Sequence, residues 1–126
     1  MFEMTFEYII KPFEPIRFSV TNMKEITVSE LKQLKDNNAD FQLIDVREDH
    51  EVEIAEIGGE HIPMGQVMDN LDKISKDKQV IIHCRSGARS GAICQALEKA
   101  GYTNVYNLKG GILAWANEID PAVAKY

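Results

Sequence analysis

The fold is decided by one stretch of the sequence, Gln79-Val80-Ile81-Ile82-His83-Cys84-Arg85-Ser86-Gly87-Ala88-Arg89-Ser90. Its first residues form a short run of β-branched apolar side chains, which is typical of a strand buried on both faces. After Ser90 the apolar residues recur at helical spacing, and Gly101 is well suited to end a helix. The stretch therefore predicts a buried strand, a loop that carries Cys84, and a helix that follows the loop.

The chain on both sides of this stretch shows the same alternation of strand and helix. Further strands are predicted at 41–46 and 104–108, and further helices at 29–38, 48–55, 67–74 and 112–119. We expect Ser29 to cap the first of these helices. Such alternation predicts an α/β fold in which a parallel sheet has helices on both faces. Ligands of these sheets bind at the carboxyl ends of the strands, so the loops after Ile44, Ile82 and Leu108 are the candidate site.

The first 22 residues differ in composition from the remainder of the chain. They hold four of the five phenylalanines, and Pro12 and Pro15 would interrupt a helix there. We therefore expect residues 1–22 to form an N-terminal extension or arm, and residues 23–126 to form the domain. These residues are either a linker or an edge hairpin packed on the domain, or an arm that completes a dimer or docks a neighbouring domain.

Composition excludes several classes of function. The 126 residues suit a single soluble domain, and the formal net charge of −6 at pH 7 argues against binding to nucleic acid. No apolar run reaches membrane-spanning length, and the first residues do not resemble a secretory signal. Two cysteines are few for a disulfide scaffold, so we expect a cytoplasmic protein. Cys84, Cys94 and the three histidines match no metal-binding pattern, and we expect no metal.

Cys84 is the candidate nucleophile because of its position between the strand and the helix. Unpaired backbone N–H groups at the start of the helix can hold an anion, and Gly87 lets the loop curl around it. Arg85 and Arg89 add positive charge. All of these features favour the thiolate, so we expect the pKa of Cys84 to lie below that of a free thiol. Cys94, which lies among helical apolar residues, is expected only to pack in the core.

The other residues of the loop are candidates for substrate binding or support. We expect the residues after Cys84 to contact the substrate, namely Arg85, Ser86, Gly87, Ala88 and Arg89. The guanidinium of Arg89 suits sulfonate or sulfite oxygens. Ser90 is expected to hydrogen-bond the sulfur or to cap the helix. Asp45 and Arg47 are expected to form a structural ion pair that orders the neighbouring loop.

Four motifs, in order along residues 24–126, resemble those of rhodanese-homology domains. The loop at 83–90 resembles the active-site loop of that family, and the other motifs are Asp45-Val46-Arg47-Glu48 with Glu51, then Ile62-Pro63, and lastly Asn107-Leu108-Lys109-Gly110-Gly111 with Trp115. The resemblance implies a parallel sheet of about five strands. It also implies transfer of a sulfane sulfur, from thiosulfate or a protein persulfide, through a persulfide on Cys84 without a separate cofactor.

The end of the chain indicates a more specific pathway. Residues 111–126 resemble the C-termini of rhodanese domains that are fused to E1-like adenylyltransferases. Those enzymes pass sulfur to ubiquitin-like sulfur carriers in molybdopterin, thiamine or thiouridine synthesis. The resemblance therefore implies an adenylyltransferase and a sulfur carrier as partners.

Two alternatives to sulfur transfer stay open. The first is a non-catalytic binding module of the same fold, against which the intact Cys84 loop argues. The second is a cysteine-dependent phosphatase or arsenate reductase. Related folds with that activity place an arginine six residues after the cysteine, where this chain has Ser90. The loop is therefore one residue short for a tetrahedral oxyanion.

Overall fold

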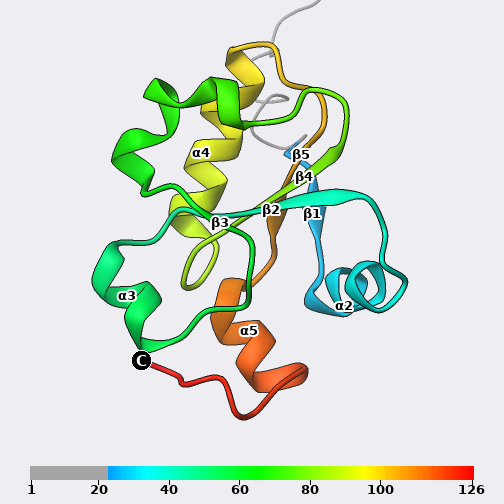
Figure 1. Ribbon diagram of the computed structural model, residues 1–126, viewed down its shortest axis with the longest axis vertical. Coiled ribbons are helices and arrows are strands. Elements are labelled where there is room, and N and C mark those ends of the chain that lie inside the picture. Colours follow the sequence, from blue (N-terminus) through cyan, green and yellow to red (C-terminus); the bar gives the residue numbers. More distant parts are fainter. Residues whose placement is uncertain (1–22) are drawn as a thin grey trace, which may run out of the picture.

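The centre of the molecule is a parallel sheet, shown in Figure 1. A computed structural model describes residues 23–126, and in this part of the chain the sheet has five strands in the order β1-β5-β4-β2-β3. The strands are β1 (Glu25–Ile26), β2 (Phe41–Asp45), β3 (Glu60–His61), β4 (Gln79–His83) and β5 (Val105–Leu108). Every strand pair is parallel. The predicted α/β fold with about five parallel strands is therefore confirmed.

Helices cover both faces of the sheet, as the alternating pattern predicts. The α-helices are α2 (Val28–Asp36), α3 (Asp49–Ile54), α4 (Ala88–Lys99) and α5 (Gly111–Glu118), and the 3-10 helices are η1 (Met64–Asp69) and η2 (Leu71–Lys73). One apolar cluster joins α4 and η1 to one face of the sheet, and a second joins α2 and α5 to the other. Figure 1 shows α4 and α5 on opposite sides of the strands.

Strand β4 lies between β5 and β2 and contributes to both cores. Val80 and Ile82 belong to the α4 cluster, and Ile81 belongs to the α2 and α5 cluster. All three side chains are fully buried, because alternate residues of a strand face opposite sides of a sheet. This central position places Cys84, the residue after β4, at the middle of the carboxyl edge of the sheet.

Two local predictions are wrong. Thr27 caps α2 in place of Ser29, because Thr27 and Glu30 form a capping box in which each side chain accepts the other's backbone N–H. The predicted helix at 67–74 is instead two 3-10 helices that meet at Asn70. The spacing of Val67, Leu71 and Ile74 buries apolar side chains equally well in short 3-10 turns.

Residues 1–22 lie outside the described part of the chain, so the arm and its boundary at residue 23 stay predictions. Between residues 23 and 126, no helix is both long and apolar enough to cross a membrane.

Candidate active site

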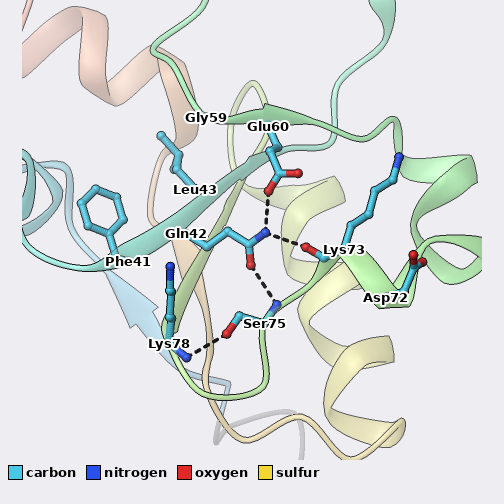
Figure 2. A pocket seen from close by; sticks show the side chains of 9 residues that line it. All are labelled: Phe41, Gln42, Leu43, Gly59, Glu60, Asp72, Lys73, Ser75 and Lys78. Carbon is cyan, nitrogen blue, oxygen red and sulfur yellow. Dashed lines mark hydrogen bonds between the residues drawn. The ribbon is translucent and has the colours of Figure 1, made fainter.

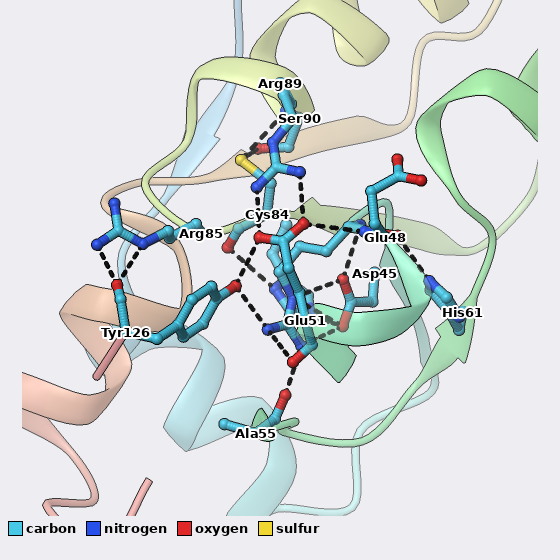
Figure 3. Close-up of polar contacts among 12 residues, drawn as sticks. Asp45, Glu48, Glu51, Ala55, His61, Cys84, Arg85, Arg89, Ser90 and Tyr126 are labelled. Carbon is cyan, nitrogen blue, oxygen red and sulfur yellow. Dashed lines mark hydrogen bonds and ion pairs between the residues drawn. The ribbon is translucent and has the colours of Figure 1, made fainter. Parts of the chain in front are cut away.

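The Cys84 sulfur lies inside a ring of hydrogen-bond donors at the start of α4. The backbone N–H of Gly87 donates to Sγ at 3.1 Å, and the N–H of Ser90 donates to it at 3.4 Å. The Ser90 hydroxyl lies 3.3 Å from the same sulfur (Figure 3). Gly87 is the N-cap of α4 and has a φ of 108°, a left-handed conformation that favours glycine. The loop therefore curls so that the first turn of the helix faces the sulfur.

These donors decide the charge of Cys84. Burial alone raises the pKa of a thiol, and Cys84 is almost fully buried. The Ser90 hydroxyl and the N–H groups of Ser90, Gly87 and Ser86 stabilise the anion, and together they bring the pKa of Cys84 below its ordinary value. The lowered pKa agrees with the prediction from sequence. Hydrogen bonds to the sulfur, rather than the charges of Arg85 and Arg89, account for most of the lowering.

The N-terminus of α5 holds the Cys84 loop from the other side. Ile112 N–H donates to the Cys84 carbonyl at 3.0 Å, and Leu113 N–H donates to the Arg85 carbonyl at 3.1 Å. Gly111 makes this approach possible, because a Cβ at this position would lie 2.5 Å from the Arg85 oxygen and 2.6 Å from the Cys84 oxygen. With these carbonyls turned towards α5, the following N–H groups can turn towards the sulfur.

Asn107, in strand β5, contacts the same loop, and sequence reasoning assigned it no role at the site. Its Nδ2 donates to the Gly87 carbonyl at 3.0 Å, and its Oδ1 lies 2.5 Å from the Ser90 hydroxyl oxygen. Asn107 is 4% exposed. A buried polar residue in an otherwise apolar strand is the sequence signal that marks such a position.

Arg89 is engaged in a two-pronged ion pair with Glu51 of α3. Its Nη1 and Nη2 donate to the two carboxylate oxygens at 2.7 Å and 2.9 Å. Arg89 holds the pKa of Glu51 well below its usual range, and Glu51 raises the pKa of Arg89. This ion pair connects the first turn of α4 to α3, and the Arg89 guanidinium is already paired with a carboxylate. Its role as a substrate ligand stays a prediction.

Arg85 is bound to Tyr126, which sequence reasoning also missed. Arg85 Nε donates to the main-chain oxygen of Tyr126 at 2.5 Å, and its guanidinium lies 5.3 Å from the centre of the tyrosine ring. The Tyr126 hydroxyl accepts from Arg47 at 2.9 Å and donates to Glu51 at 2.8 Å. Figure 3 shows Tyr126 between Arg85 and Glu51, with Arg89 on the far side of Glu51. Tyr126 thus contacts Arg85, Arg47 and Glu51, and Glu51 connects it to Arg89.

Asp45 and Arg47 form a buried ion pair beside Glu51 and Tyr126. Arg47 donates from Nε at 2.9 Å and from Nη2 at 2.7 Å to the carboxylate, which also accepts the Arg47 backbone N–H at 3.0 Å. Arg47 Nη2 donates further to the Ala55 carbonyl at 2.8 Å. Burial raises the pKa of Asp45, but the Arg47 hydrogen bonds and nearby charges outweigh it and lower the pKa. This geometry is that of a structural pair that orders the turn between β2 and α3.

His83 is fully buried beside this pair, at the end of β4. Its Nε2 lies 3.6 Å from Asp45 Oδ2 and has no hydrogen-bond partner among the described residues. Burial lowers the pKa of His83 to about 4, although Asp45 acts in the opposite direction. The imidazole is therefore neutral at pH 7, and its contact with the Cys84 residue is to the backbone oxygen.

A separate pocket of about 450 Å³ lies at the opposite end of the sheet, where β2 begins. Figure 2 shows Gln42 at its centre, where the amide donates to Glu60 and to the Lys73 carbonyl and accepts from the Ser75 N–H. Its lining includes two lysines and two carboxylates, so it carries charges of both signs. It contains no part of the Cys84 loop, and the Gln42 amide at its centre is already hydrogen-bonded to the protein. The Cys84 edge is therefore the candidate active site.

Comparison with known proteins agrees with this geometry. Residues 27–118 match the rhodanese-like domain family. The chain is 39% identical over 100 residues to a putative sulfurtransferase, YtwF, of Bacillus subtilis, covering 79% of this chain and 96% of that one. It is 35% identical over 104 residues to the probable adenylyltransferase/sulfurtransferase MoeZ of Mycobacterium tuberculosis, covering 80% of this chain and 26% of that one.

A solved structure resembles the fold as well. The rhodanese-like domain protein of Staphylococcus aureus superimposes with a TM-score of 0.71 at 33% sequence identity, over 82% of this chain and 99% of that one. The family match covers most of the chain and includes β2, the Cys84 loop and the Gly110–Gly111 turn. The putative sulfurtransferase YtwF is covered over 96% of its length, whereas the match to MoeZ covers about a quarter of that longer protein. The chain therefore belongs to the family of rhodanese-like domains, and its family relationships are those of a rhodanese-type sulfurtransferase.

Proposed function

We propose that this chain transfers a sulfane sulfur through a persulfide on Cys84. The Cys84 thiolate attacks the outer sulfur of a donor such as thiosulfate, the sulfur–sulfur bond of the donor breaks, and sulfite leaves with the electron pair. An acceptor thiolate, or cyanide in an assay, then attacks the outer sulfur of the persulfide. The Cys84 thiolate leaves with the bonding pair and is regenerated.

The observation that carries this proposal is the set of donors around the Cys84 sulfur. Two backbone N–H groups and the Ser90 hydroxyl approach Sγ within 3.1–3.4 Å. Such a ring stabilises a sulfur anion, both on Cys84 and as it leaves during the second step. In our proposal, backbone N–H groups of the exposed loop residues Ser86 and Ala88 receive the outer sulfur. In our proposal Arg85 leaves Tyr126 and contacts the anionic donor. Arg89 stays paired with Glu51 and contributes positive charge near the sulfur.

Loop composition favours sulfur over phosphate. The residue six positions after Cys84 is Ser90, which points its hydroxyl at Sγ. An arginine there would supply the two-pronged contact that a phosphate needs. The guanidinium of Arg89, one position earlier, is turned to Glu51. The site therefore suits one small sulfur anion better than a tetrahedral oxyanion.

The test is mass spectrometry of the protein as purified without reductant, combined with a thiosulfate:cyanide assay. We expect the mass of one extra sulfur atom on the peptide that contains Cys84, and its loss after cyanide. Cys84→Ser should abolish both the added mass and turnover. Cys94→Ala is the matched control, since Cys94 is buried in the α4 core, and should keep both. Sulfur transfer by Cys84→Ser at the parent rate would contradict the proposal.

We further propose that the acceptor is a ubiquitin-like sulfur carrier activated by an E1-like adenylyltransferase. This proposal is supported by the similarity to MoeZ, whose name joins both activities, and by the tail at 111–126. Both cysteines of the chain are free, which suits the reducing cytoplasm, where we place the reaction. Affinity purification from cells should recover the enzyme or the carrier. Recovery of neither, with a protein that still carries a Cys84 persulfide, would contradict this partner assignment.

A further inference from the structure

The Ser90 hydroxyl has one hydrogen and two acceptors. Its oxygen lies 3.3 Å from Cys84 Sγ and 2.5 Å from Asn107 Oδ1, and all three residues are buried. A hydroxyl donates one hydrogen bond at a time, so it can serve the sulfur or the amide but not both fully. The acceptor that carries more negative charge will attract the hydrogen more strongly.

The orientation of the Asn107 amide is fixed by its other contact. Nδ2 lies 3.0 Å from the Gly87 carbonyl, which can only accept a hydrogen bond. The amide nitrogen must therefore face Gly87, and Oδ1 must face Ser90. A Cβ on Gly91 would lie 3.3 Å from Nδ2, so the amide is also held against the first turn of α4. Asn107 can accept from Ser90 but has no hydrogen to give it.

We propose that Asn107 is a positioning residue for the sulfur chemistry, acting as the alternative acceptor of the Ser90 hydroxyl. While Cys84 is a thiol, Ser90 donates to Asn107 Oδ1 and its oxygen faces the S–H group. When the thiol proton leaves to solvent, the hydroxyl turns to the Sγ anion. When the charge moves to the outer sulfur of a persulfide, the hydroxyl returns to Asn107. This inference rests on the proposed role of Cys84 as sulfur carrier.

The proposal predicts that removal of the Asn107 amide stabilises the Cys84 thiolate, whereas a merely structural role predicts the opposite. Asn107 competes with the sulfur for one hydrogen, so removing the amide leaves Sγ as the sole acceptor and stabilises the thiolate. The Gly87 carbonyl keeps a partner, because Gly91 N–H also donates to it at 3.0 Å. If Asn107 only supported the loop, its removal would loosen the donors and destabilise the thiolate.

Other titratable groups near the sulfur are unchanged by substitution of Asn107. Arg89 and Cys94, both on α4, interact electrostatically with Cys84, and Glu51 of α3 reaches the site through Arg89. Arg85 and His83 flank Cys84 in the chain, and Arg85 is held by Tyr126. None of these side chains contacts the Asn107 amide through the hydrogen bonds described above. A change in thiol acidity on substitution therefore reports the Ser90 hydroxyl.

The experiment measures the rate of alkylation of Cys84 by iodoacetamide against pH, in reduced full-length protein without sulfur donor. Asn107→Ala should increase the acid dissociation constant of the thiol about threefold, and Ser90→Ala should decrease it about tenfold. In the Ser90→Ala background, Asn107→Ala should have no further effect. Asn104→Ala is the matched control. Asn104 directly precedes β5, its amide donates to the Ser75 and Lys78 carbonyls, and the substitution should leave the profile unchanged.

A decreased or unchanged dissociation constant in Asn107→Ala would overturn the proposal, and so would an effect that persists without Ser90. Circular dichroism and thermal unfolding check that the variants fold. Asn107→Val, which fills more of the volume, is the second variant with the same expectation. If neither variant folds, Asn107 supports the fold and the proposal is wrong. Because no sulfur donor is present, the result is separate from success or failure of sulfur transfer.

Discussion

Cys84 and Cys94 lie on the same face of the sheet and are both almost fully buried, with exposed fractions of 1% and 0%. The pKa values of their thiols nevertheless shift in opposite directions. Burial and the charges of Glu98 and Cys84 raise the pKa of Cys94 to about 12. At Cys84 the donors of the first turn of α4 outweigh burial and lower the pKa. Burial alone therefore does not predict the reactivity of a cysteine.

The difference comes from position along one helix. The first N–H groups of a helix have no partner within it, and in α4 the N–H groups of Gly87 and Ser90 face the Cys84 sulfur. Cys94 lies more than a turn further on, where backbone N–H groups are used by the helix itself, and its side chain packs in the apolar cluster with Ile93 and Leu97. A helix start can thus activate one cysteine while the same helix keeps another inert.

The largest expected effect comes from Gly111→Ala, which should make Cys84 resemble Cys94. The new Cβ would lie within about 2.6 Å of the Cys84 and Arg85 carbonyls, and Gly111 has a φ of 60°. The N-terminus of α5 must then move away, and the loop donors lose their alignment with the sulfur. We expect about 2 kcal/mol lower stability and more than a tenfold loss of Cys84 alkylation at pH 7. Thermal unfolding and alkylation kinetics measure these effects.

Gly65→Ala is the control for that experiment. Gly65 lies in η1, and a Cβ there would meet no atom within 4 Å. It should leave both stability and alkylation near the parent values. Parent-like alkylation by a folded Gly111→Ala variant would mean that α5 does not align the loop.

The second prediction asks whether nearby charge also contributes to the difference in acidity between the two cysteines. Glu51→Gln leaves Arg89 without its carboxylate partner, so an uncompensated positive charge remains near the Cys84 sulfur. We expect the dissociation constant of the Cys84 thiol to increase about threefold, and stability at pH 7 to fall by about 1 kcal/mol. Glu53→Gln, an exposed change on the same helix, is the control. An unchanged alkylation profile would show that the paired Arg89 does not influence the sulfur.

The stability part of this prediction depends on pH. Arg89 lowers the pKa of Glu51 in the folded protein, so the ion pair contributes its full stability above the ordinary carboxyl pKa of about 4.3. That contribution is lost as the pH falls further and the carboxylate becomes protonated. The difference in unfolding free energy between the parent and Glu51→Gln should therefore be largest at neutral pH and shrink below about pH 4. A difference that grows on acidification would contradict this assignment.

The sequence was sufficient for the fold and for the reactive loop because both depend on local patterns. The run Val80-Ile81-Ile82 is buried on both faces, and Cys84 comes two residues after Ile82, directly after the end of β4. The partners of the arginines could not be predicted in this way. Arg89 pairs with Glu51 at a separation of 38 residues, and Arg47 meets Tyr126 at a separation of 79. Opposite charges are common in any sequence, and only the folded chain selects which of them meet.

Asn107 shows a different limit of prediction from sequence. Its motif was recognised, but a polar residue in a strand can face solvent, a neighbouring strand or a helix. The side chain reaches Gly87 and Ser90 because β5 pairs with β4 in a register that opposes Ile82 with Asn107. Register between distant strands is set by the whole sheet. The helix predicted at 67–74 is wrong for a local reason, since its apolar spacing fits an α-helix and two 3-10 helices equally well.

The smallest expected effect comes from Cys94→Ala, which tests whether Cys94 is unreactive in the folded protein. With a pKa of about 12, the Cys94 thiol is uncharged between pH 5 and 9, so its removal should not alter the alkylation profile of Cys84. The buried cavity should reduce stability by about 1 kcal/mol. The folded parent should take one alkyl group at neutral pH, and the urea-unfolded parent two, as counted by mass spectrometry. If Cys94 is alkylated as fast as Cys84 in the folded state, then helix position does not govern their reactivity.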